Sequence, residues 1–214
     1  MLVRKENKLF FKGLPFFIVA SLFLLSFYLC SKVLVNDDAF WLLNLTKLFI
    51  HGGRYYHDFI ENTPPMVFYL YSPALAISFL FHLTAWRAFE IYFYLLAFIS
   101  LIFCDILLRK IIQDEDYLLY CISLIFLAIS FLLLNIPDFG DRECFTIVLV
   151  MPYVLLAVVR ADNKNFPILL SVLVGVMAGI GFAVKPFFII PLVFIEIYLI
   201  AIKRTLLTWV RPEA

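Results

Sequence analysis

The chain has 214 residues, of which 64% are hydrophobic and 18% are aromatic, and its mean hydropathy is +1.01. Soluble domains contain roughly 45–50% apolar residues, so this composition excludes a soluble globular fold. The 17 basic and 16 acidic residues leave a net charge of +1, and this balance gives no basic field for nucleic acid. The sequence therefore predicts an all-α polytopic bundle of transmembrane helices. It forms a single integral membrane domain over residues 1–214, in contact with membrane lipids and binding no nucleic acid.

The N-terminal segment carries four basic residues, Arg4, Lys5, Lys8 and Lys12, directly before an apolar run over residues 14–35. The run is longer than the apolar core of a signal peptide and has no small-x-small cleavage site. We therefore expect a signal anchor that stays attached. Its N-terminus is expected to face the cytoplasm, because basic flanks stay on that side.

Six apolar stretches are predicted to cross the membrane, which takes about 20 residues for a helix. A seventh stretch, residues 65–81, has borderline length, begins at a Pro-Pro pair and contains Pro73. The six predicted spans are residues 14–35, 87–108, 117–136, 144–159, 166–184 and 187–202.

Charge placement predicts that residues 65–81 do not cross. Basic residues cluster at the N-terminus and after three of the spans, and all clusters can face the cytoplasm only if this stretch stays outside. We expect it to be an interfacial helix on the outer face. The clusters after the spans contain Arg109, Lys110, Arg160, Lys164, Lys203 and Arg204.

The same topology places a first outer loop over residues 36–86, a second over 137–143, and the Lys185-Pro186 junction on one face. Within the first loop, residues 40–50 have helical apolar periodicity and stop at His51-Gly52-Gly53, which predicts a second interfacial helix.

An aspartate pair, Asp37 and Asp38, lies where the first span ends. Ionisable residues at a membrane span are costly to hold against lipid, so they indicate a functional site. The alternative is structural: Asp and Asn are favoured helix N-caps, and Asn36 or one of the aspartates could cap the helix over 40–50.

The second outer loop offers three carboxylates, including Asp141, beside Arg142. Asp141 could instead cap the following span. Lys185 could reach the interface only to keep its ammonium in water. Arg87 and Glu90 could form a local helical pair.

The order of these motifs resembles a known family. An acidic pair follows the first span, then come a helix, a Gly-Gly-x-Tyr-Tyr segment, a Pro-Pro that enters a further helix, and an Arg-led second span. An external Asp before the fourth span and a Gly-x-x-x-Lys between later spans complete it. The chain resembles the N-terminal module of polyprenyl-phosphate-dependent, GT-C-type glycosyltransferases. This class includes the protein mannosyltransferases of glycosyltransferase family 39 and the aminoarabinose transferases.

The resemblance implies transfer of a sugar from a polyprenyl-phosphate donor to a lipid, glycan or protein acceptor at the outer face of a bacterial inner membrane. Asp37, with Asp38 beside it, would be the catalytic acid position, as general base or as ligand of a divalent metal ion together with Asp141. A positioned carboxylate can take the proton of an acceptor hydroxyl. Arg142 and Lys185 would bind the donor phosphate.

Three further residues are expected to bind substrate on the same resemblance: Tyr55 and Glu61 in the aromatic, acidic stretch before the Pro-Pro, and Arg87 at the start of the second span. The chain departs from the family at Thr63, where many relatives have Lys. Full-length relatives also continue through more spans, so we expect the chain to lack their C-terminal part.

The alternative class is a non-catalytic membrane protein, such as an assembly partner or a transporter subunit. A transporter needs polar groups along a path through the bilayer, but only Glu196 lies about halfway along a span. The polar residues instead gather at one surface, which favours catalysis there over transport. Glu196 itself is a costly residue inside a span. It is expected to have a partner in the bundle. Ser171, Gly175 and Gly179, spaced by four, predict a close contact with another helix or chain.

Overall fold

The structure is a computed structural model that describes residues 2–33, 36–112, 116–134, 136–204 and 211–213. The described residues form helices and no β-strand, which confirms the all-α prediction. The elements are α1 (Leu2–Cys30), α2 (Asp37–Ile50), α3 (Met66–Phe81), α4 (Ala85–Ile111), α5 (Tyr117–Leu132), α6 (Arg142–Ala161), α7 (Ile168–Ala183), the short 3-10 helix η2 (Pro186–Phe188) and α8 (Ile189–Lys203).

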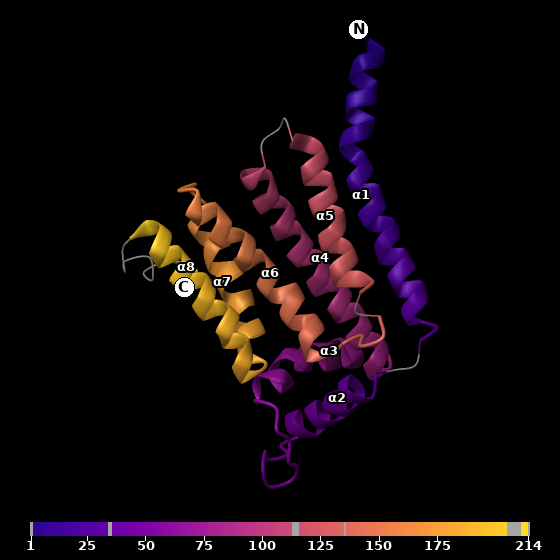
Figure 1. Ribbon diagram of the computed structural model, residues 1–214. Helices are drawn as coiled ribbons and strands as arrows, with labels where there is room; N and C mark the ends of the chain where they lie inside the picture. The colour runs from indigo at the N-terminus through magenta and orange to yellow at the C-terminus, as the bar shows by residue number, and fades with distance from the viewer. Residues whose placement is uncertain (1, 34–35, 113–115, 135, 205–210, 214) are drawn as a thin grey trace.

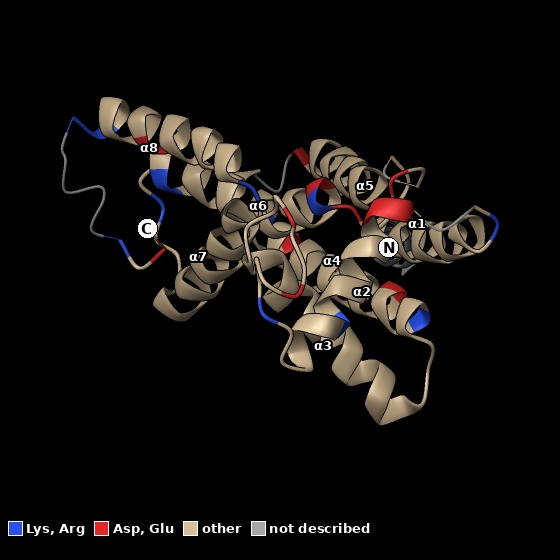
Figure 2. Ribbon diagram, turned by 90° about the horizontal axis from the view of Figure 1, so that it is seen from below, with Lys and Arg blue, Asp and Glu red and all other residues tan. Residues whose placement is uncertain are grey.

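The long helices run side by side, and α2 and α3 lie across one end of them (Figure 1). Along the bundle, α1 packs on α5, α4 on both α5 and α6, and α6 on α7 and α8, while α3 packs on α4 and α2 on α3. We call the end covered by α2 and α3 the α2/α3 end. Figure 2 views the molecule from there and shows that most of the helical ribbon carries neither acidic nor basic residues.

Four helices of the described chain are long and apolar enough to cross a membrane: the Gly13–Cys30 part of α1, α4 (Ala85–Ile111), α6 (Arg142–Ala161) and the Pro186–Lys203 segment. These coincide with four of the six predicted spans. Helices α5 and α7 have 16 residues each. At 1.5 Å per residue each is about 24 Å long, less than the roughly 30 Å of a hydrocarbon core.

The contacts at the first turn of α2 show which residue caps the helix. The side chain of Asn36 accepts a hydrogen bond from the backbone N–H of Ala39 at 3.0 Å, so Asn36 is the N-cap and the two aspartates occupy the first turn. The helix ends at His51, as the glycine-rich stop predicts.

Aromatic rings fill the core beneath α2 and α3. The buried rings of Tyr71, Phe89, Phe93 and Phe145 meet with centroids 4.8–5.6 Å apart. The Tyr71 hydroxyl also donates a hydrogen bond to the backbone carbonyl of Gly140 at 2.7 Å. The rigid packing of α3 against α4 and α6 therefore fixes the turn that leads into α6.

The small residues of α7 were predicted to contact another helix or chain, but at Gly175 the close neighbour is the C-terminal segment of the same chain, which is not helical. A Cβ atom there would lie 2.7 Å from the backbone oxygen of Glu213, so residues 211–213 pack directly on this helix. Ser171 accepts a hydrogen bond from Arg160 at 2.9 Å. A Cβ atom at Gly179 would meet nothing within 4 Å.

Candidate functional site

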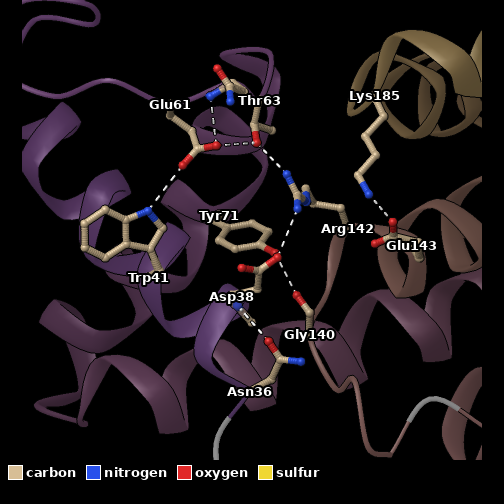
Figure 3. A network of polar contacts seen from close by, with 12 residues as sticks. Asn36, Asp38, Trp41, Glu61, Thr63, Tyr71, Gly140, Arg142, Glu143 and Lys185 are labelled. Carbon is tan, nitrogen blue, oxygen red and sulfur yellow. Dashed lines mark hydrogen bonds and ion pairs between the residues drawn. The ribbon is translucent and has the colours of Figure 1, made fainter.

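Arg142, the first residue of α6, joins the two predicted outer loops. Its Nη2 atom donates to Oδ2 of Asp38 in α2 at 3.1 Å, and its Nη1 atom donates to the hydroxyl of Thr63 (Figure 3). Thr63 is 3% exposed, so this contact is made at the buried side of the loop. The guanidinium is held by two partners that lie 104 and 79 positions earlier in the chain.

Glu61 and Tyr55 hold the segment before the Pro-Pro in place. The carboxylate of Glu61 accepts hydrogen bonds from Trp41 Nε1 at 3.2 Å, from the backbone N–H of Asn62 and from the Thr63 hydroxyl. The Tyr55 hydroxyl lies 2.5 Å from the backbone carbonyl oxygens of both Glu61 and Thr63. Burial raises the pKa of Tyr55 to about 12, so it stays a neutral donor. Both predicted substrate-binding side chains therefore shape this loop.

Asp141 occupies the N-cap position of α6, yet its side chain makes no capping hydrogen bond. The side chain of Asp141 therefore does not cap α6, contrary to the structural alternative. Its Oδ1 atom is buried with no hydrogen-bond partner among the described residues. Burial, with the nearby charges of Glu143 and Asp38, raises the pKa of Asp141 to about 6. A carboxyl group with a raised pKa can exchange its proton closer to neutral pH than an ordinary aspartate, which favours acid–base chemistry.

Lys185 lies on the loop between α7 and α8, close to Glu143. Its ammonium pairs with Glu143 in the first turn of α6 (Figure 3) and sits over the rings of Phe187 and Phe188 at 5.6 and 5.7 Å. Its side chain is 16% exposed, so most of it is covered by protein. The third predicted outer segment is thus attached to the second by an ion pair.

Asp37 and Arg87 stand apart from these contacts. Asp37 is exposed and makes no hydrogen bond or ion pair with any described residue. Arg87 pairs with Glu90 at 2.7 Å, and Trp86 donates to the other oxygen of the same carboxylate at 2.9 Å. The local pair expected for Arg87 is therefore present, and its cation is bound to Glu90, not to the network around Arg142.

Thr63, Trp41 and Tyr71 belong to this site although the sequence did not single them out as site residues. Each acts through a contact with a distant segment: Thr63 with Arg142, Trp41 with Glu61, and Tyr71 with the carbonyl of Gly140. The departure at Thr63 from the motif of the family that the sequence resembles was the one available signal.

The described part of the chain holds no group of three or more His, Cys, Asp or Glu side chains that could bind a metal ion. The assignment of Asp37 and Asp141 as metal ligands stays a prediction. The arrangement offers two cations, Arg142 and Lys185, among the carboxylates of two loops. Such a set can bind an anionic group and accept a proton beside it.

Comparison with known proteins finds no relative: no family model matches the chain, and no curated protein or solved structure is similar to it at the level that indicates a relationship. The GT-C resemblance therefore rests on the short motifs alone.

Proposed function

We propose that the chain is a glycosyltransferase module of the GT-C type, which transfers a sugar from a polyprenyl-phosphate donor to an acceptor at the α2/α3 end. In this proposal six helices cross the membrane, α2 and α3 lie in its outer interface, and the N-terminus is in the cytoplasm of a bacterial cell. The acceptor is a lipid, a glycan or a protein.

The contact of Arg142 with Asp38 and Thr63 is the observation that carries the proposal. It joins Asp38 of the acidic pair, the segment before the Pro-Pro and the second acidic loop, three of the segments that carry the motifs of the resemblance. The guanidinium also lies against Thr63, the position where many relatives have lysine. We infer that Arg142 supplies the cation that this lysine provides in those relatives.

The proposed chemistry is displacement at the anomeric carbon of the donor sugar. The acceptor hydroxyl oxygen forms the new bond to that carbon while the bond to the phosphate oxygen breaks, and polyprenyl phosphate leaves. Asp37 takes the hydroxyl proton, because its carboxylate has no described partner, whereas Asp38 is bound to Arg142. Arg142 and Lys185 stabilise the negative charge on the leaving phosphate.

The orientation of α2 and α3 supports the interfacial part of the proposal. Both helices expose large apolar side chains, with Trp41 55% and Tyr69 59% exposed, and aromatic residues of this kind favour the membrane interface. The opposite end of the bundle carries Arg109, Lys110 and Lys203, as expected for a cytoplasmic face.

Transfer of a radiolabelled sugar from a polyprenyl-phosphate donor tests the proposal in membranes that contain the chain. Transfer should require the chain and fall by about a hundredfold in Arg142→Ala, because a lost charge contact in the transition state costs roughly 3 kcal/mol. Transfer that is equal in membranes without the chain would rule the proposal out.

A non-catalytic transporter subunit is the second candidate. The observation in its favour is a group of four charged, largely covered residues: Arg160 of α6, Glu196 of α8, and Arg211 and Glu213 of the C-terminal segment. Ion flux into vesicles that contain the purified chain, with no sugar transfer, would support this alternative.

A further inference from the structure

A cavity of about 580 Å³ lies between α7 and α8, away from the site around Arg142. Its walls are mainly apolar, with Val172, Val176 and Phe182 on one side and Leu192 and Val193 on the other. Cavities of this volume and polarity are typical of sites for small apolar molecules. Several of its wall residues, such as Val176 and Val193, are exposed, so the cavity is open to the surroundings of the protein.

Tyr153, Glu213 and Glu196 are the polar residues among those that line this otherwise apolar cavity, and Glu196 has an oxygen atom without a partner among the described residues. Its side chain is 7% exposed and lines the cavity. Its Oε1 atom accepts hydrogen bonds from Tyr153 and from Nη2 of Arg211, but its Oε2 atom is buried with no partner among the described residues. A buried carboxylate oxygen without a hydrogen bond destabilises the folded protein, so a ligand that donates a hydrogen bond to Oε2 is favoured.

The charges around Glu196 decide which donor fits. Glu196 pairs with Arg211, Arg211 lies 3.6 Å from Glu213, and Glu213 pairs with Arg160 at 2.8 Å. The two arginines balance the two glutamates, so a charged head group would be unpaired in this low-dielectric place. An uncharged donor, such as a hydroxyl, satisfies Glu196 Oε2 without adding charge. The Nε atom of Arg211 also has no hydrogen-bond partner among the described residues.

We propose that this cavity binds a long-chain alcohol, with its hydroxyl donating to Glu196 Oε2 and its hydrocarbon chain between α7 and α8. The site is separate from the proposed glycosyl transfer and does not depend on it. The cavity walls supply the apolar contact, and the carboxylate supplies the preference for a hydroxyl over other head groups.

Photo-labelling with hexadecanol that carries a diazirine in its chain tests this site in the detergent-purified full chain. Labelled peptides, identified by mass spectrometry, should come from α7 and α8. Unlabelled hexadecanol should compete at about tenfold lower concentration than its methyl ether, because the ether cannot donate and leaves the carboxylate unsatisfied, a cost of roughly 1.4 kcal/mol. Hexadecylamine should also compete less well than hexadecanol, since its charge is unpaired.

Gly179→Leu is the variant that fills the cavity. Gly179 lines it, and a Cβ atom there has no neighbour within 4 Å, so the first atom of the new side chain causes no clash. Labelling should fall about tenfold or more. Gly13→Leu in α1 is the matched control, because Gly13 does not line the cavity and its added Cβ makes only an ordinary contact with Phe17. Labelling should be unchanged in this variant.

Glu196→Gln keeps the volume and turns one oxygen into an amide donor, so the preference for alcohol over ether should disappear while chain binding remains. Equal competition by alcohol and ether in the wild type would overturn the proposal. Labelling that is spread over α1 and α5, or that persists in Gly179→Leu, would overturn it as well, and would mean that ordinary lipid fills the groove.

Discussion

Arg142 donates a hydrogen bond to Asp38 across 104 positions of sequence, and the two ends of this contact differ in burial. The Arg142 side chain is 18% exposed, whereas that of Asp38 is 64% exposed. The guanidinium also holds Thr63 inside the protein. The contact is therefore anchored on α6, and the carboxylate of α2 reaches it from the solvent side.

Replacing the two partners should have unequal effects on stability. Asp38→Asn removes one exposed ion pair, so we expect the free energy of unfolding to fall by less than about 1 kcal/mol. Arg142→Ala also leaves buried groups without their partner, so we expect a loss of about 1–3 kcal/mol. Chemical unfolding in detergent measures both. Equal losses would mean that the Thr63 contact adds nothing.

The turn before Asp141 depends on Gly140, which has φ +84. In Gly140→Ala the new Cβ would lie 2.4 Å from Cε1 of the buried Phe89 ring. Strain from the positive φ and overpacking together should cost about 3 kcal/mol or more.

Gly52→Ala is the matched control for this effect. Gly52 also has a positive φ, of +93, but nothing lies within 4 Å of the added Cβ. Only the backbone strain applies, so the loss should be about 1–2 kcal/mol. Thermal unfolding of both variants compares them, and a Gly140→Ala protein as stable as Gly52→Ala would contradict the packing around Phe89.

Asp141 should make stability depend on pH. Its pKa is raised from 3.8 to about 6 in the folded protein, so folding favours its protonated form. Its contribution is fully present below about pH 4 and is lost as the pH rises through about 6. The stability of wild type relative to Asp141→Asn should therefore fall over this range, as unfolding at several pH values can measure. A difference that does not change with pH would show that the carboxyl is not desolvated.

The helices could be predicted from the sequence because apolar periodicity and stop signals are local. The glycine-rich stop after residue 50 and the Pro-Pro start of α3 mark their positions directly. The ends of α5 could not be placed as well: an apolar run over residues 117–136 does not reveal that the helix ends at Leu132. Apolar composition continues past that end, so hydropathy alone cannot locate it.

The site could be predicted only as a set of loops on one face. The cap of α2 is a local contact between Asn36 and Ala39, and Asn36 was one of the candidates for it. That Arg142 pairs with Asp38 depends on how distant segments pack. The partner predicted for Glu196 is likewise present, but Arg211 lies 15 positions further along and no periodicity points to it. Long-range side-chain contacts of this kind leave no pattern in a single sequence.

The proposed topology predicts which residues a membrane-impermeant thiol reagent can reach. In a background whose four native cysteines are replaced, Asp58→Cys and Asp138→Cys should be labelled from outside the cell, because both positions are exposed at the α2/α3 end. Asp162→Cys, exposed at the opposite end, should be labelled only after the membrane is opened. Labelling of Asp162→Cys in intact cells would contradict the six-span arrangement.

The most direct test of the proposed function is sugar transfer by wild type and by Asp37→Asn, with labelled polyprenyl-phosphate donors in membranes and with protein levels matched. Asp58→Asn is the control, since Asp58 is an exposed carboxylate of the same loop that pairs with Arg54. We predict transfer by wild type and Asp58→Asn and a loss of at least about a hundredfold in Asp37→Asn, the size expected when a general base is removed. Undiminished transfer by Asp37→Asn, or no transfer by the folded wild-type chain, would contradict the account.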